Sequence, residues 1–114
     1  QRQMCIRDRN QVVMNIVGNA ADAIEDQGTI TIATRESDGQ YVIEIADTGP
    51  GVAEELRERI FEPFFTTKPI GSGTGLGLAI AYNVVRAHDG HIAVGTSPEG
   101  GARFTISVPL RATT

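Results

Sequence analysis

The sequence predicts an α/β fold of the α+β type: a two-layer sandwich with a mixed, mostly antiparallel sheet and helices on one face. Three observations lead to this fold class. Two segments repeat apolar residues at helical spacing, four short segments have the pattern of strands, and an Asp-Gly turn joins the first two strands as a hairpin. The 114 residues suit one compact domain, without an internal repeat or an interdomain linker.

The expected elements follow in a simple order. A helix is expected over 10–26, ended by Gly28, because glycine suits the left-handed position after a helix. Strands follow at 29–35, half-buried because isoleucine alternates with threonine, and at 41–47. A short acidic helix at 54–60, an irregular segment at 61–68 and a flexible loop at 71–75 come next. The chain then forms a helix from residue 76 to about 88–90, strands at 91–96 and 102–109, and a frayed tail.

Composition narrows the classes of function. The net charge of −4 and the absence of a basic cluster argue against a nucleic-acid partner. No apolar run approaches the roughly 18 residues of a membrane span, so membrane attachment of the parent protein would lie outside this chain. Cys5 is the only cysteine, which excludes an internal disulfide and is compatible with a cytoplasmic protein.

Residues 1–9 are expected to be foreign to the domain. They lack the periodicity of the residues that follow, and 2–8 match the translation of a transposon-type sequencing adapter. We therefore treat 1–9 as a non-native or disordered segment and 10–114 as the domain. A short native arm is the alternative, and the sequence upstream of Asn10 would decide between the two.

The first helix has a polar edge. Asn15, Asn19 and Asp22 lie at i, i+4 and i+7, so they form one row beside the apolar face. Asparagine is mildly unfavourable inside a helix, and a solvated face is the simpler interpretation of the row. Amide and carboxylate oxygens in a row also suit a hard cation such as Mg²⁺, which makes these residues a candidate metal site.

Asp47 marks the point where the second strand ends in a Gly-Pro-Gly segment, 49–51. A turn-forming aspartate is the simpler interpretation. However, a carboxylate at a strand end can accept a hydrogen bond from the exocyclic amine of adenine. Gly49 and Gly51 would then let the backbone pass close to the flat base.

A phenylalanine-rich segment, 61–68, ends at Lys68, the only lysine of the chain. Aromatic residues usually fill a core, but a lysine is a flexible point charge suited to a phosphate. Glycines at 71, 73, 75 and 77 then free the backbone to turn its N–H groups toward oxyanions, and the next helix adds N-terminal donors. No strand leads directly into this loop and no Gly-Lys-Ser/Thr follows, so neither the dinucleotide-binding fingerprint nor the P-loop fits.

In this order, the four pieces resemble the histidine kinase catalytic domains of the GHKL ATPase superfamily, over essentially all of 10–114. Residues 15–23 resemble its N box, 47–51 its G1 box, 61–68 its F box and 71–78 its G2 box, while 100–106 are similar to its final strand. The N and F boxes are most similar to the nitrogen-regulatory sensor kinase branch. Such domains usually have a strand before the first helix. The chain is therefore expected to be truncated, with one sheet edge unprotected.

The resemblance implies an ATP-binding catalytic domain that uses ATP and Mg²⁺. Asn15, Asn19 and Lys68 would be catalytic, with Asn19 as the Mg²⁺ ligand and Asn15 as a second candidate beside it. Asp47 would bind the adenine amine, with Gly49 and Gly51 shaping that end. The further nucleotide contacts that it implies are Asp22, Gly73, Thr74, Gly75, Leu76, Gly77 and Thr105.

The resemblance also implies a protein-histidine kinase of a two-component system. Such a kinase transfers the γ-phosphate of ATP to a histidine on a separate dimerisation domain, for relay to the receiver domain of a response regulator. His88 lies at an expected helix end and His91 begins an expected strand, so neither fits the acceptor role. The chain alone is expected not to autophosphorylate, and to contact neither nucleic acid nor a membrane.

Two alternatives stay open. GHKL hydrolases of the topoisomerase, chaperone or mismatch-repair type share the pattern at 19–23. They need a glutamate one turn before Asn19, where this chain has Asn15, and an amide cannot act as a general base. A non-catalytic nucleotide-binding module is the second alternative.

Overall fold

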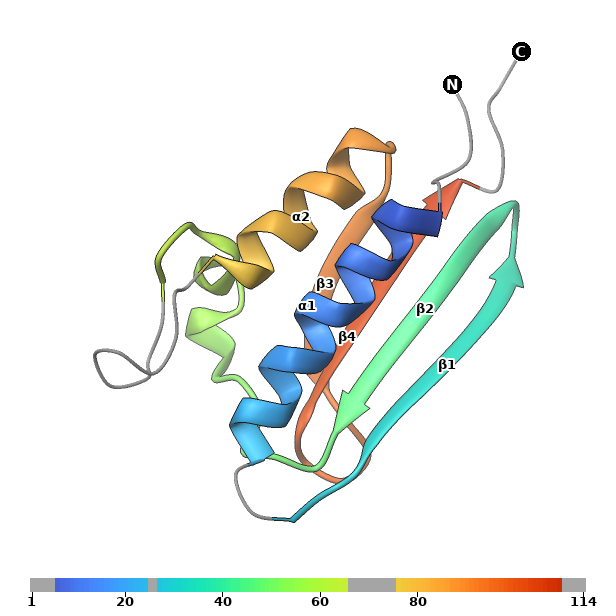
Figure 1. The fold of residues 1–114 in the computed structure, drawn as a ribbon. Coiled ribbons are helices and arrows are strands. Elements are labelled where there is room, and N and C mark those ends of the chain that lie inside the picture. Colours follow the sequence, from blue (N-terminus) through green and yellow to red (C-terminus); the bar gives the residue numbers. More distant parts are fainter. Residues whose placement is uncertain (1–5, 25–26, 66–75, 110–114) are drawn as a thin grey trace.

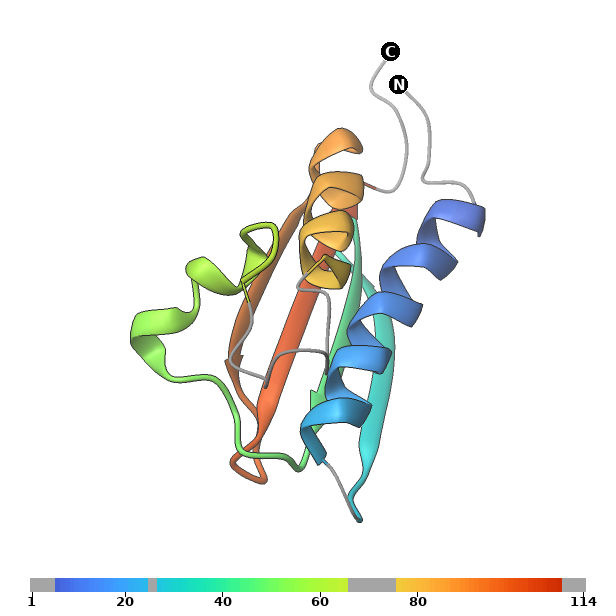
Figure 2. The same cartoon turned by 60° about the vertical axis from the view of Figure 1, so that its left-hand side comes forward.

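Two helices cover one face of a four-stranded sheet (Figure 1). The computed structural model describes residues 6–24, 27–65 and 76–109. The helices are α1 (Ile6–Ile24) and α2 (Gly77–Ala87). The strands are β1 (Ile30–Ser37), β2 (Gln40–Asp47), β3 (His91–Thr96) and β4 (Ala102–Pro109), in the spatial order β1-β2-β4-β3. Figure 2 shows both helices on the same side of the sheet, so the predicted two-layer sandwich is confirmed.

The pairing of the strands is antiparallel throughout the described part of the chain. The parallel pairing that a mixed sheet would require is therefore not found among the described residues. Asp38 and Gly39 both have positive φ, 54° and 77°, and connect the pair Ser37–Gln40. Positive φ at both central residues defines a type I′ turn, whose twist suits a hairpin. The Asp-Gly signal therefore predicted this hairpin correctly.

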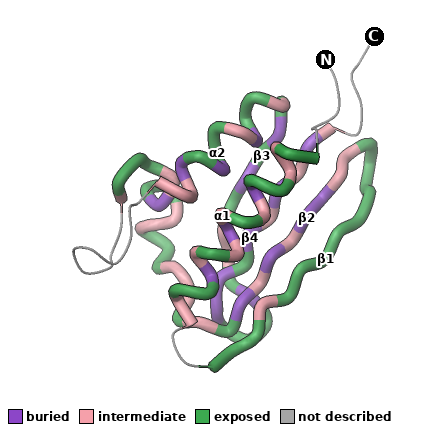
Figure 3. The backbone as a smooth tube through the Cα atoms, in the orientation of Figure 1, coloured by how far each residue is buried: buried purple, intermediate pink, exposed green. Residues whose placement is uncertain are grey.

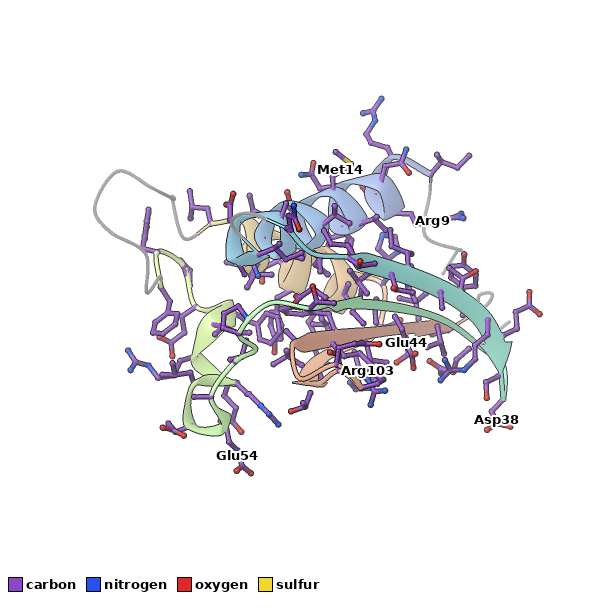
Figure 4. The ribbon with its side chains drawn as sticks, turned by 90° about the horizontal axis from the view of Figure 1, so that it is seen from below. Arg9, Met14, Asp38, Glu44, Glu54 and Arg103 are labelled. Atoms are coloured by element: carbon purple, nitrogen blue, oxygen red, sulfur yellow. The ribbon has the colours of Figure 1, made fainter. Side chains whose placement is uncertain are left out.

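The core lies between the two helices and the central strands. The largest fully buried side chains come from both layers: Phe104, Ile16, Ile45, Ile106, Val12 and Val85. Figure 3 shows the burial concentrated on β2, β4 and the facing sides of the helices. The opposite face of the sheet is open to solvent. Figure 4 shows Glu44 and Arg103 on that side and Met14 on α1, across the sheet.

The prediction that the first strand is half-buried was wrong. Seven of the eight residues of β1 are exposed, and only Ile30 is of intermediate burial. Ile32, on the helix side of the sheet, has 49% of its surface exposed. The reason is that β1 forms the edge of the sheet and α1 packs more against β2 than against β1, so most of β1 lacks a helix to pack against.

Two other boundaries differ from the prediction. Helix α1 begins at Ile6, four residues earlier than expected, and residues of that extra turn contact the fold: Asp8 Oδ2 lies 2.9 Å from His88 Nε2, and the Arg9 guanidinium lies over the Tyr41 ring. The origin of residues 1–9 stays a prediction. The expected acidic helix at 54–60 is instead two 3₁₀ turns, η1 (Glu54–Leu56) and η2 (Arg59–Phe61), because a seven-residue segment without a capping side chain is too short for a stable α-helix.

Helix α2 ends as predicted, at His88 and the residues after it. The N–H of Gly90 donates to the Val85 carbonyl at 2.9 Å, and Asp89 adopts a left-handed φ of 61°. His88 is thus the helix C-cap and its ring faces Asp8. Neither of the described helices is long and apolar enough to cross a membrane.

Candidate functional site

The candidate site lies along the polar edge of α1, between α2 and the segment that follows β2. Near the middle of α1, Asn15 faces the start of α2: a Cβ placed on Gly77 would lie 3.9 Å from the Asn15 Cβ. At the end of α1, a Cβ on Gly49 would lie 3.4 Å from the Ala23 carbonyl oxygen. Three motifs that are distant in the sequence therefore meet along one helix.

Asp47 is the last residue of β2, and its side chain is held at one oxygen. The residue is 3% exposed. Its Oδ1 accepts hydrogen bonds from the backbone N–H of Gly49 at 2.8 Å and of Ala102 at 3.2 Å. No donor to Oδ2 is recorded among the described residues, so this oxygen has capacity for a further donor.

The β3–β4 turn supports Asp47 from the other side. Ser97 is buried and its hydroxyl donates to the Asp47 carbonyl oxygen at 2.9 Å. A Cβ on Gly101 would overlap that same carbonyl. Sequence reasoning missed Ser97, Gly101 and Ala102, although the Gly-Gly pair at 100–101 was a signal of a close backbone approach.

Gly51 continues the close packing at this end of the sheet. Its φ is 81°, and a Cβ there would come 3.0 Å from the Gly100 carbonyl oxygen. Both the left-handed backbone and the lack of space require glycine. Gly49 and Gly51 were predicted to let the backbone pass close to a flat base; the close contacts that the structure describes are within the protein, and the contact with a base stays a prediction.

Asn15 has an unusual side-chain environment. Its Oδ1 accepts from Gln11 Nε2 at 3.3 Å, but its Nδ2 is buried without a hydrogen-bond partner among the described residues. A buried polar group without a partner is uncommon in native structures, and it suggests that a missing group completes the site. The side chain lies beside Gly77, at the N-terminus of α2, where backbone N–H groups also lack intrahelical partners.

The remaining residues of the polar row differ in exposure. Asn19 is of intermediate burial and Asp22 is exposed. The described residues contain no group of three or more His, Cys, Asp or Glu that could hold a metal ion. The side-chain oxygens of Asn15, Asn19 and Asp22 fit Mg²⁺ only if phosphate oxygens and water supply most of the ligands, which is the usual way that proteins bind this ion.

An aromatic cluster borders the N-terminal part of α2. Phe61 packs against Tyr82 and Phe104, with ring centroids 5.5 Å and 6.2 Å away. Arg59, in the same 3₁₀ turn as Phe61, lies over the Phe65 ring, whereas Phe64 is 71% exposed with a φ of 66°. The segment therefore packs the partly buried Phe61 against the core and presents Phe64 to solvent.

Some predicted residues are not brought to this site. Thr105 was predicted as a nucleotide contact, but it pairs with Glu44 and Ala93 on the face of the sheet away from both helices. Its neighbour Phe104 points into the core instead. The predicted Lys68, Gly73, Thr74 and Gly75 lie outside the described residues, while Leu76 and Gly77 form the start of α2 beside Asn15.

Both the sequence and the fold of this chain match known proteins. Residues 6–112 match the family described as "Histidine kinase-, DNA gyrase B-, and HSP90-like ATPase". The signal transduction histidine-protein kinase AtoS of Escherichia coli is 48% identical over 101 residues, which cover 88% of this chain and 16% of AtoS. The chain thus spans less than a fifth of that relative.

Two solved structures have the same fold. Full-length ShkA in complex with AMPPNP superposes with a TM-score of 0.80 at 38% identity, over 94% of this chain and 22% of ShkA. The histidine kinase ThkA in complex with the response regulator protein TrrA superposes with a TM-score of 0.74 at 32% identity, over 90% of this chain and 28% of ThkA.

Proposed function

Since the chain belongs to the histidine kinase-, DNA gyrase B- and HSP90-like ATPase family, we propose that it is the ATP-binding catalytic domain of a two-component sensor histidine kinase. The observation that carries the proposal is the Asp47 carboxylate, which is buried at the end of β2 with one oxygen fixed and one available. The full-length protein would transfer the γ-phosphate of ATP to a histidine on a separate dimerisation domain.

Asp47 would select adenine. With Oδ1 held by two backbone N–H groups, Oδ2 can accept a hydrogen bond from the exocyclic amine of the base. The two fixed donors allow only an acceptor at Oδ1, so the orientation of the carboxyl group is set before the nucleotide arrives. A base with a carbonyl in place of the amine would bring an acceptor against the carboxylate and would be rejected.

The other end of the site would hold Mg²⁺ and the phosphates. We assign Asn19 as the metal ligand through its amide oxygen and Asn15 as its neighbour, with the unpartnered Nδ2 of Asn15 as a donor to a phosphate oxygen. Mg²⁺ would neutralise phosphate charge there. Lys68 and the backbone N–H groups at 73–77 would bind further phosphate oxygens, with Asp22 at the rim.

Transfer is favoured over hydrolysis by the residue at position 15. An ATP hydrolase of this fold needs a general base that activates water, and the amide of Asn15 cannot accept that proton. The groups proposed for the chain position and neutralise phosphates, which is most of what phosphoryl transfer to another protein group requires of the protein.

The partners follow from the same reaction. We propose that the domain acts on a phosphoacceptor histidine domain of its own protein and that a response regulator receives the phosphoryl group; the complex of ThkA with TrrA is the parallel. We place the domain in the cytoplasm and expect no contact of this domain with nucleic acid or membrane. Alone, the chain is expected to bind ATP but not to autophosphorylate.

The test is Mg²⁺-dependent binding of a non-hydrolysable ATP analogue to the wild-type chain, Asp47→Ala and Asp47→Asn. The Asn variant keeps an acceptor for Gly49 and Ala102 but turns an N–H₂ toward the adenine amine. Loss of a hydrogen bond to a charged group corresponds to roughly 10- to 150-fold weaker binding. The matched control is Asp38→Asn, which changes an exposed carboxylate in the β1–β2 turn and should bind as wild type does.

Three outcomes separate the interpretations. Weak binding by folded Asp47→Asn, with normal binding by Asp38→Asn, supports the adenine site. Undiminished binding by both Asp47 variants would show that the adenine assignment is wrong. If the wild-type chain shows no binding, a module without nucleotide function becomes the better interpretation.

A further inference from the structure

Ser97 is buried in a position that the proposed reaction does not require. Among the described residues, the buried polar or charged side chains are Asp47 and Ser97, at 3% and 4% exposure. The two residues are in contact, because the Ser97 hydroxyl donates to the Asp47 carbonyl oxygen at 2.9 Å. Ser97 is thus buried against the candidate adenine-binding aspartate.

The sheet hydrogen bonds explain why this hydroxyl is needed. In a hairpin with a two-residue turn, the flanking pair Ser37–Gln40 is hydrogen-bonded, and so is every second pair after it. Asp47 falls between these pairs, so its N–H and C=O point away from β1 and toward β4. A regular ladder would therefore join the Asp47 carbonyl to the N–H of Ala102.

That ladder bond is replaced. The β2–β4 register ends one step earlier, at Ala46↔Arg103. The N–H of Ala102 donates to the Asp47 carboxylate instead, at 3.2 Å, and the Ser97 hydroxyl takes the carbonyl. The serine hydroxyl thus supplies a donor to the carbonyl that would otherwise compete with the carboxylate for the N–H of Ala102.

The turn keeps Ser97 in place. The N–H of Ser97 donates to the Gly101 carbonyl at 2.7 Å, and the N–H of Gly100 donates to the Ser97 carbonyl at 2.9 Å. Both backbone groups and the side chain of Ser97 are therefore bonded. Such a residue can hold the start of β4 at a fixed distance from the end of β2.

We propose that Ser97 is a positioning residue of the nucleotide site: by binding the Asp47 carbonyl, its hydroxyl frees the Ala102 N–H to orient the Asp47 carboxylate toward the exocyclic amine of adenine. This inference rests on the proposed function. Without the hydroxyl, the Ala102 N–H can close the ladder on the Asp47 carbonyl, and the carboxylate loses one of its two fixed donors.

The experiment compares two nucleotides on the wild-type chain and on Ser97→Ala. One is a non-hydrolysable ATP analogue, and the other is the same analogue built on purine, which lacks the exocyclic amine. Loss of one net hydrogen bond predicts that Ser97→Ala binds the ATP analogue about 3- to 10-fold more weakly. Binding of the purine analogue should change by less than about twofold, because it does not use the aligned oxygen.

The matched control is Thr96→Ala. Thr96 is the residue before Ser97, and its hydroxyl accepts a hydrogen bond from Arg57 Nη2 at 3.0 Å. Among the described residues, this hydroxyl makes no hydrogen bond to Asp47. This variant should keep the wild-type ratio of the two affinities. If Ser97→Ala does not fold, Ser97→Cys takes its place, since the thiol has a similar shape and is a weak donor. It is expected to lower the ratio in the same direction.

The outcomes distinguish the two proposals. If the wild-type chain binds both analogues equally, the adenine assignment fails, and the positioning role fails with it. If the wild-type chain prefers the amine but Ser97→Ala, or Ser97→Cys in its place, keeps that preference, the positioning role alone is overturned. Equal weakening of both analogues also overturns it, because a purely structural defect would act on them alike.

Discussion

Replacing Asn15 by leucine is expected to stabilise the nucleotide-free chain and to weaken its binding of nucleotide. Leucine has the same branching as asparagine but has no polar atom at the position of Nδ2, which is buried without a partner among the described residues. The variant therefore removes a cost that the native sequence bears in the absence of ligand.

The magnitude follows from three terms. An unsatisfied buried donor costs about 1–3 kcal/mol, and the variant recovers this. It loses the hydrogen bond from Gln11, which is long at 3.3 Å and exposed, so that its loss costs about 0.5–1 kcal/mol. Leucine is the better helix former by about 0.4 kcal/mol. The three terms sum to a gain of about 0.4–3 kcal/mol, centred near about 1.5 kcal/mol, and each kcal/mol raises the unfolding midpoint by about 4–8 °C.

Denaturant and thermal unfolding without nucleotide measure this gain. The matched control is Asn83→Leu, at an exposed asparagine on α2. This variant should gain only the difference in helix propensity, about 0.4 kcal/mol of unfolding free energy. A second series adds the ATP analogue with Mg²⁺, which should raise the midpoint of the wild-type chain but barely that of Asn15→Leu. The reasoning is refuted if Asn15→Leu is no more stable than Asn83→Leu. It is also refuted if nucleotide raises the unfolding midpoint of Asn15→Leu as much as it raises that of Asn83→Leu and the wild type.

Two further predictions concern glycines. Gly39→Ala should lower the free energy of unfolding by about 1 kcal/mol, because the φ of 77° is unfavourable for alanine although the surroundings of Gly39 are open. Gly95, which is also open but has no positive φ, is the control, and Gly95→Ala should raise the free energy of unfolding by about 0.4–1 kcal/mol. Equal effects of the two substitutions in urea unfolding would contradict the argument. In Gly101→Ala, the new Cβ would overlap the Asp47 carbonyl, so the substitution should lower the free energy of unfolding by about 2 kcal/mol or more and abolish binding of the ATP analogue. A folded variant that binds the analogue as the wild type does would disprove the tight contact.

The sequence predicted those parts of the fold that depend on local signals. The period of α1, the Asp-Gly hairpin and the end of α2 each follow from neighbouring residues, and the structure confirms them. The burial of β1 could not be predicted in the same way. Ile32 has the right residue type for a core, but its exposure depends on where α1 packs, which is a property of the whole fold.

In the candidate site, too, residues with a local sequence signal could be predicted and residues that act from distant segments could not. Asp47 could be identified because a glycine-rich segment breaks its strand. Ser97 and Ala102 could not, since they lie 50 and 55 residues further along the chain and act through one hydroxyl and one backbone N–H. Thr105 was assigned to the nucleotide side, but alternation along β4 directs Phe104 to the core and Thr105 to the open face.

The two ends of the site differ in what they require before nucleotide binds. Around Asp47, the carboxylate and the carbonyl are already bonded to the protein, so the proposed adenine base would meet a group that needs no rearrangement. Around Asn15, a buried donor has no partner among the residues that the structure describes, and a phosphate oxygen would remove that cost on binding. Substitutions at the two ends should therefore differ in sign: Ser97→Ala lowers both stability and affinity, whereas Asn15→Leu raises stability as it lowers affinity. A site held together only by packing would not separate the two quantities in this way.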